Sequence, residues 1–325
     1  MKWRFLIPAA IFAVLLAAFW AEVQSRNLQA SVGGHVVSAF FSFALLIAGE
    51  WFFGFGLGDT LNSVLGGDRP QFRVIRIFLP SLLVIPYLVF AIPRNALDYR
   101  YALVMALFPV ALAAIVEFST RVQRFEWPDA IVLIAIALAL ELRIFSPAWP
   151  YNGLGSLPKL YLADVALYLY LVVRRLQGVG YSLIPRLNAY LIGFREWVFF
   201  LPLALGLGFA LHFIAFFPRH QTFGHILLAL VVVFFLTAVP EEIFFRGILQ
   251  NLLEGRFGER TALIVAALLF GLSHFHKGAS FNWRYVILAA IAGVFYGRAW
   301  RSRRQILASS TTHTLVDVVW GLWFR

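Results

Sequence analysis

The sequence contains no cysteine, which excludes disulfide bonds, thiolate metal ligands and a cysteine nucleophile. Charged residues are scarce: they make up 13% of the chain, against about a quarter of a soluble globular protein. Hydrophobic residues make up 61% of the 325 positions. This apolar excess must contact something other than water, so the composition excludes a water-soluble domain.

Long apolar runs account for the excess. A membrane-spanning helix needs about 20 predominantly apolar residues, and the chain has room for about 8–11 such helices. We therefore predict an all-α, polytopic transmembrane helix bundle. The apolar runs lie at residues 5–23, 36–57, 77–92, 101–118, 129–146, 160–173, 197–217, 223–239, 261–276, 285–299 and 306–323.

The less apolar segment from Gly178 to Trp197 interrupts this series. It contains Pro185 and several charged residues, which predicts an amphipathic helix lying in the membrane interface. It also predicts a domain boundary. We expect an N-terminal transmembrane bundle of unknown role at residues 1–177 and a second domain at residues 178–325.

We interpret the net charge of +11 first as a signal of membrane topology, because basic residues concentrate in cytoplasmic loops. With eleven spans and a cytoplasmic N-terminus, every basic cluster falls on the cytoplasmic side, while the opposite loops hold fewer basic residues. We therefore predict an integral membrane protein with a cytoplasmic N-terminus, membrane lipids as partners, and no nucleic-acid partner. The clusters are Lys2/Arg4, Arg69/Arg73/Arg76, Arg121/Arg124, Arg174/Arg175, Arg256/Arg260 and Arg298/Arg301/Arg303/Arg304.

Charged residues inside apolar spans are costly, so each is a candidate functional residue. Four acids stand singly, and we expect these to serve as internal hydrogen-bonding partners or to lie at helix ends. They are Glu50, Glu117, Glu141 and Asp164.

The segment Pro240-Glu241-Glu242-Ile243-Phe244-Phe245-Arg246 differs from these single acids. Proline is favoured at a first helical position, so a helix is expected to restart here, with two carboxylates in its first turn. Glu242 and Arg246 are four residues apart and share a helix face, which favours an ion pair. Glu241 points elsewhere, and this makes it available as a general base.

Two further C-terminal spans carry ionisable groups. Phe270 and His274 share one face of their helix, and His313 and Asp317 are one turn apart on the last helix. A carboxylate at that spacing can orient the imidazole, or both groups can line one cavity. Three consecutive segments thus place ionisable groups in apolar sequence.

These motifs resemble those of the CPBP (CAAX protease and bacteriocin-processing) family of intramembrane proteases. The segment from Glu241 to Arg246 resembles the EExxxR motif, Phe270 with His274 the FxxxH motif, and His313 with Asp317 the HxxxN/D motif. Order and spacing agree over about residues 185–325, and the bacterial branch described as CAAX prenyl protease-related is the most similar. This branch implies the inner (cytoplasmic) membrane of a bacterium.

The resemblance implies a role for each matching residue. Glu241 and His274 would activate the attacking water, and His313 with Asp317 would stabilise the oxyanion or complete the polar cavity. Glu242, Arg246 and Phe270 would support the shape of the site. The implied activity is hydrolysis of a peptide bond in a membrane-anchored protein or peptide, in a cavity among the C-terminal helices.

Metal dependence stays open at the level of sequence. Two histidines with a carboxylate would make an acceptable zinc set, with an open position for water. The candidate ligands are Glu241, His274 and His313. The same groups suffice for general-base hydrolysis without zinc.

Two other classes of protein remain as alternatives. A transporter or channel could use the same polar residues to line a permeation path, since broken helices with polar ends are typical of transporters. No second Glu-Glu break occurs in the N-terminal half, as an internal repeat would require. The other alternative is a non-catalytic membrane scaffold or immunity protein.

Overall fold

The computed structural model describes residues 3–25, 36–65, 70–117, 119, 122–151, 154–218, 221–276 and 281–324. Within these ranges the regular structure is helical, apart from an isolated bridge between Phe216 and Phe324. The predicted all-α class is confirmed. Of the basic residues used for topology, Lys2, Arg69 and Arg121 lie outside the described residues.

The chain folds as two compact units, which are described separately. The first comprises residues 1–122 and 126–177, and the second comprises residues 178–325 together with residues 123–125. The short segment belongs to the second unit, where the amide of Phe125 donates to the carbonyl oxygen of Leu252 over 2.9 Å. That residues 1–177 form an N-terminal transmembrane bundle and residues 178–325 a second domain stays a prediction.

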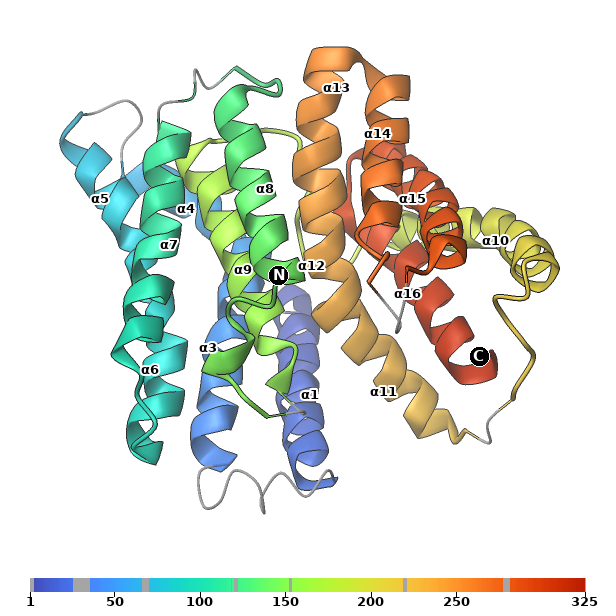
Figure 1. The fold of residues 1–325 in the computed structure, drawn as a ribbon, viewed down its shortest axis with the longest axis horizontal. Coiled ribbons are helices and arrows are strands. Elements are labelled where there is room, and N and C mark those ends of the chain that lie inside the picture. Colours follow the sequence, from blue (N-terminus) through green and yellow to red (C-terminus); the bar gives the residue numbers. More distant parts are fainter. Residues whose placement is uncertain are drawn as a thin grey trace. The chain divides into compact units, whose positions relative to one another are not determined.

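Each of the eleven apolar runs forms a helix (Figure 1). In the first unit the helices are α1 (Trp3–Ser25), α3 (Val36–Gly54), α4 (Leu57–Val64), η2 (Pro70–Phe72), α5 (Arg73–Phe78), η3 (Leu79–Val84), α6 (Ile85–Ala91), η4 (Ile92–Arg94), α7 (Tyr99–Glu117), α8 (Trp127–Glu141), η5 (Ser146–Ala148), α9 (Leu157–Leu167) and the π-helix η7 (Tyr168–Val173).

In the second unit they are α10 (Leu187–Ala210), α11 (Phe223–Val233), the π-helix η8 (Phe234–Ala238), α12 (Val239–Glu242), the π-helix η9 (Ile243–Gln250), α13 (Asn251–Phe257), α14 (Glu259–Leu272), α15 (Trp283–Arg303) and α16 (Ile306–Trp323).

Five helical stretches among the described residues are long and apolar enough to cross a membrane. Several of the remaining apolar runs form shorter or more polar helices. For example, α8 has 15 residues, and α15 carries arginines at both ends. Whether these also span the membrane, giving 8–11 spans in all, stays a prediction. The five are Val36–Gly54, Arg73–Arg94, Tyr99–Glu117, Leu187–Ala210 and Phe223–Phe257.

Buried charges in the first unit have packing roles. Glu117, the last residue of α7, pairs with Arg76 over 2.7 Å, as expected for an acid at a helix end. Asp164 of α9 is buried, and its carboxyl lies against Gly49 of α3. A Cβ added at Gly49 would lie 2.6 Å from Asp164 Oδ2, so a larger residue at this position would force the Asp164 side chain or the helices to shift.

The prediction of an interfacial helix from Gly178 to Trp197 is wrong. Residues 178–186 are not helical, and α10 runs without a break from Leu187 through Trp197. The charges near its middle are accommodated because Glu196 accepts from Arg195 and pairs with Arg298 of α15 over 3.2 Å. With its charges paired, α10 continues from the polar segment into the apolar run that starts at Trp197.

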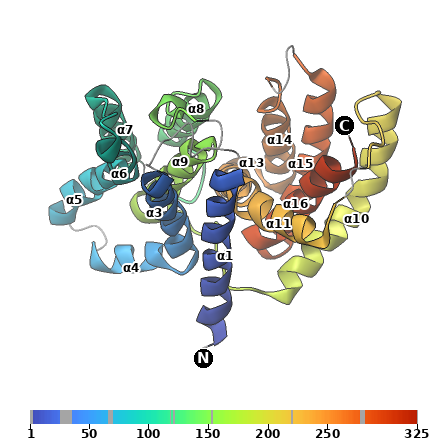
Figure 2. The same ribbon diagram turned by 90° about the horizontal axis from the view of Figure 1, so that it is seen from below.

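Glycines bring the helices of the second unit close together. Figure 2 shows α10, α14, α15 and α16 side by side. A Cβ on Gly271 of α14 would lie 2.5 Å from the carbonyl oxygen of Val286, and one on Gly293 of α15 would lie 3.0 Å from Cα of Ala267. Small residues at such crossings are typical of helices that pack within membranes.

The helix from Phe223 to Phe257 is continuous but changes its geometry twice. Two π-helical segments, η8 and η9, flank the short α12, which contains Pro240, Glu241 and Glu242. The helix therefore does not restart at Pro240, as the sequence suggested. Proline has no N–H to donate to the preceding turn, and a widened π turn is one way in which a helix absorbs that loss.

Candidate active site

A fully buried ion pair forms the base of the site. Arg246 Nε lies 3.2 Å from Glu242 Oε2, and neither side chain is exposed. Arg246 Nη2 also donates to the carbonyl oxygen of Gly293 on α15 over 3.4 Å. The pair predicted from the four-residue spacing is present, and it joins the long helix to α15.

Aromatic rings enclose the guanidinium group. Arg246 Cζ lies 4.7 Å from the ring centre of Phe270 and 5.6 Å from that of Tyr296. A cation over an aromatic face is attracted by the ring quadrupole, more strongly where water is excluded. Phe270 thus connects α14 to the ion pair.

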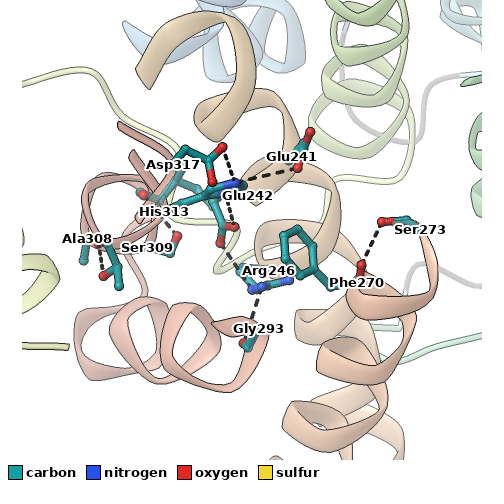
Figure 3. A network of polar contacts seen from close by, with 12 residues as sticks. Glu241, Glu242, Arg246, Phe270, Ser273, Gly293, Ala308, Ser309, His313 and Asp317 are labelled. Atoms are coloured by element: carbon teal, nitrogen blue, oxygen red, sulfur yellow. Dashed lines mark hydrogen bonds and ion pairs between the residues drawn. The ribbon is translucent and has the colours of Figure 1, made fainter. Parts of the chain in front are cut away.

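Three carboxylates surround the imidazole of His313 on α16 (Figure 3). Its Nδ1 atom lies 3.0 Å from Glu242 Oε1, and its Nε2 atom lies 3.5 Å from Asp317 Oδ2 and 3.8 Å from Glu241 Oε2. The cluster contains three carboxylates and the guanidinium group of Arg246, so negative charge exceeds positive charge. This excess favours a protonated His313 ring, which donates hydrogen bonds from both nitrogens.

The carboxylates differ in exposure. The Glu242 side chain is completely buried, whereas those of Glu241 and Asp317 are 16% and 32% exposed. A carboxylate that exchanges protons with a reacting water must reach that water. Glu241 and Asp317 are partly exposed, whereas Glu242 is held between Arg246 and His313.

His274 lies at the end of α14 and is buried. Its Nδ1 atom lies 2.9 Å from the carbonyl oxygen of Phe270 and 3.1 Å from Ser273 Oγ. A carbonyl oxygen only accepts, so Nδ1 carries the proton. In the neutral ring, Nε2 then holds the lone pair and is the nitrogen that can accept a proton.

The two histidines line the same cavity, which has a volume of about 90 Å³. A water molecule occupies about 30 Å³ in the liquid, so the cavity has room for a few waters or for an apolar group. Its walls are mainly apolar and aromatic. The residues with polar atoms most relevant to chemistry are His274, Tyr285, Tyr296, His313, Asp317 and Trp320.

Sequence reasoning missed the tyrosines of α15. The ring of Tyr296 stacks on that of His313, with centres 4.6 Å apart and planes at 16°. Tyr285 packs edge-on against His274 at 4.9 Å. The two tyrosines are eleven residues apart, close to three helical turns, so their shared face was a signal available in the sequence.

The possible zinc set of Glu241, His274 and His313 does not fit a metal as these residues lie. In the part of the chain that the structure describes, no group of three or more His, Asp or Glu residues could hold a metal ion. Both nitrogens of His313 face carboxylate oxygens at 3.0–3.8 Å, whereas a zinc ligand presents a ring lone pair to the metal.

Comparison with known proteins identifies the region that carries this site. Residues 223–319 match the family model described as "Type II CAAX prenyl endopeptidase Rce1-like". The matched region contains all seven candidate residues, from Glu241 to Asp317. Searches of curated proteins and of solved structures found no match.

The resemblance seen in the three motifs is thereby confirmed for this part of the chain. Together with the apolar helices, the match describes an integral membrane protein. The C-terminal region is a Rce1-like type II CAAX prenyl endopeptidase (CPBP) domain, and membership of that family implies an intramembrane protease that acts on a protein or peptide.

Proposed function

We propose that this protein hydrolyses a peptide bond of a membrane-anchored protein or peptide, with a water molecule activated by Glu241 and His274. The observation that carries the proposal is the cluster around His313. One imidazole contacts three carboxylates and lines a cavity together with a second histidine. Burying so many ionisable groups is costly for a role in packing alone.

In the proposed reaction, Glu241 accepts a proton from the attacking water. Its partial exposure gives it access to water, and its neighbour Glu242 is already committed to Arg246. Nε2 of His274 is the second proton acceptor, because its Nδ1 proton is held by the carbonyl oxygen of Phe270. The two groups together raise the nucleophilicity of the water.

The remaining residues hold this arrangement. His313 and Asp317 complete the polar wall of the cavity. Glu242, which is paired with Arg246, holds the imidazole of His313 through its contact with Nδ1. Phe270 supports the guanidinium on one side. No step of the proposal passes through a metal ion.

The apolar walls support a substrate with an apolar group next to the scissile bond, such as a lipid-modified C-terminal peptide. The distribution of basic loops supports a cytoplasmic N-terminus, and we propose the cytoplasmic membrane of a bacterium as the location. The peptide would enter from the membrane, which its anchor already occupies.

The test uses purified full-length protein in detergent and a farnesylated fluorogenic peptide that ends in a CAAX sequence. Glu241→Gln and His274→Ala should each lower kcat at least 100-fold, because general acid–base groups contribute about 10²–10⁴-fold. His276→Ala is the matched control, since this exposed histidine lies two residues from His274. Full activity in either site variant refutes the assignment.

A chelator separates the two mechanisms left open by the sequence. Active protein is treated with a zinc chelator, and bound metal and turnover are measured on the same sample. Retained turnover without bound metal excludes a zinc mechanism. Loss of turnover that returns when zinc is added refutes the metal-free proposal.

A further inference from the structure

The connection between α10 and α11 forms part of the cavity wall. Residues 211–217, which we call the strap, are not helical. Phe213 and Ile214 of the strap line the cavity together with His274 and His313. Apolar side chains from a connecting segment therefore face the site, in addition to those from α10, α14, α15 and α16.

Hydrogen bonds hold the strap at both ends. The amides of Phe213 and Ile214 donate to the carbonyl oxygen of Gly208, in the last turn of α10, over 2.8 and 3.2 Å. At the other end, the amide of Phe217 donates to the carbonyl oxygen of Trp323 over 2.8 Å. The strap thus connects the end of α10 to the end of α16, and its backbone contacts fix where Phe213 lies.

Phe213 packs against the aromatic rings beside His274. Its ring centre lies 5.3 Å from those of Tyr285 and Trp320. The ring of Tyr285 in turn lies 4.9 Å from that of His274. Phe213 is therefore one ring removed from a proposed catalytic residue, and its side chain limits what the cavity can hold beside the reacting bond.

The size of the cavity restricts its occupant. Its volume is about 90 Å³, whereas an engineered cavity that admits benzene measures about 150 Å³. A farnesyl group is more than twice the size of benzene, so it does not fit. An aliphatic side chain of roughly three or four carbon atoms does fit. The lipid of a modified peptide then stays in the bilayer while a neighbouring side chain enters the cavity.

We propose that Phe213 is a specificity-determining residue, which limits the side chain next to the scissile bond to a short aliphatic group. The inference rests on the proposed protease function. In a farnesylated CAAX peptide, the residue that follows the modified cysteine places its side chain in the cavity, against the ring of Phe213. A leucine or valine side chain fits there, and an aromatic side chain collides with Phe213.

The first test measures kcat/KM for farnesylated fluorogenic CAAX peptides with alanine, leucine or phenylalanine after the modified cysteine. Mass spectrometry identifies the bond that is cut. Wild type should prefer leucine to phenylalanine. In Phe213→Ala, kcat/KM for the phenylalanine peptide relative to the leucine peptide should rise at least about tenfold, the lower end of what one methylene group contributes in a hydrophobic pocket. An unchanged ratio, or a wild type without the preference, overturns the proposal.

Phe209→Ala is the matched control. Phe209 lies on α10, four residues before Phe213, and it is 45% exposed. It packs against Phe324 and is not among the described residues that line the cavity. Because no pocket contact is lost, the ratio should stay within about twofold of that of wild type. An equal rise in both variants means that loosening of this region changes the selectivity, and it overturns the proposal.

A second variant covers the case in which Phe213→Ala does not fold. Ala204 lines the cavity from α10, and leucine is nearly as good a helix former as alanine. Ala204→Leu leaves the strap intact and fills part of the cavity. The ratio of kcat/KM for the leucine peptide to that for the alanine peptide should therefore fall at least about tenfold. An unchanged ratio means that the cavity does not hold this side chain, and it overturns the proposal.

Failure of the proposed function gives a different result. Wild-type protein that cuts none of the peptides refutes the protease function itself. Wild-type protein that cuts them with a preference unchanged in Phe213→Ala and Ala204→Leu refutes only the role of Phe213. A ratio of two kcat/KM values measured on one preparation does not depend on the fraction of folded enzyme, so a loss of stability alone does not change it.

Discussion

The buried pair of Glu242 and Arg246 allows a quantitative prediction about stability. At 3.2 Å and an effective dielectric constant of about 20, the attraction between the two charges is about 5 kcal/mol. The guanidinium also rests on Phe270 at 4.7 Å, a contact that contributes roughly 1–2 kcal/mol when water is excluded. These gains offset the desolvation of both ions.

Arg246→Met removes one partner and leaves the carboxylate of Glu242 buried. The carboxylate keeps its contact with His313 Nδ1 but loses the guanidinium, and we expect a loss of about 3–5 kcal/mol in the free energy of unfolding, the usual cost of removing one partner of a buried pair. At about 2–4 °C per kcal/mol, the midpoint should fall by roughly 10 °C. Glu242→Gln should cost a similar amount, since it leaves a buried guanidinium.

The double variant Glu242→Gln/Arg246→Met distinguishes this reasoning from a general loss of packing. It contains neither charge, so we expect it to be more stable than either single variant, within about 2 kcal/mol of wild type. The assay is thermal unfolding of each purified variant in detergent micelles, followed by intrinsic tryptophan fluorescence. Losses that simply add in the double variant would refute the argument.

An exposed pair in the same unit is the matched control. Arg301 and Glu259 lie 2.7 Å apart, yet their side chains are 30% and 65% exposed. Water screens such a pair, so Glu259→Gln should change stability by less than about 1 kcal/mol. The contrast between the two pairs isolates burial as the cause.

Two further predictions concern packing. Gly49→Ala should destabilise the protein by about 1–3 kcal/mol, because the new Cβ would lie 2.6 Å from Asp164 Oδ2. Adding Asp164→Ala to the same chain should recover most of the loss. Gly206→Ala is the control and should not destabilise the protein, because its Cβ would meet no atom within 4 Å. Thermal midpoints in detergent decide this, and a loss that persists without the Asp164 carboxyl counts against the clash. Phe270→Leu should lower kcat about tenfold, because the support of Arg246 and His313 is weakened; unchanged kcat on the farnesylated peptide would contradict that role.

Local patterns predicted most of the helices. Each apolar run became a helix because the length of an apolar segment and its lack of charge are properties of neighbouring residues. The pairing of Glu242 with Arg246 was predictable for the same reason, since residues four apart share a helix face. The error at residues 178–197 arose where distant partners, such as Arg298 for Glu196, neutralise local charge.

The arrangement of the site was less accessible to sequence reasoning. Glu242 contacts His313, which lies 71 residues later, and a motif spacing says nothing about that distance. The stacking of Tyr296 on His313 is equally non-local. The three motifs predicted which residues gather, whereas the tertiary packing of α12, α14, α15 and α16 determines which atoms face one another.

The π-helical segments on either side of Glu241 and Glu242 make the site depend on the number of residues in the helix. A π turn closes its hydrogen bonds one residue later than an α turn and so accommodates one extra residue. Losing a single residue from η8 would let the helix relax to ordinary α geometry without breaking it. A residue lost from the α-helical turns of α11 would instead rotate the segment before it by about 100° relative to the carboxylates. That deletion would leave the apolar helix intact and change its register against α16.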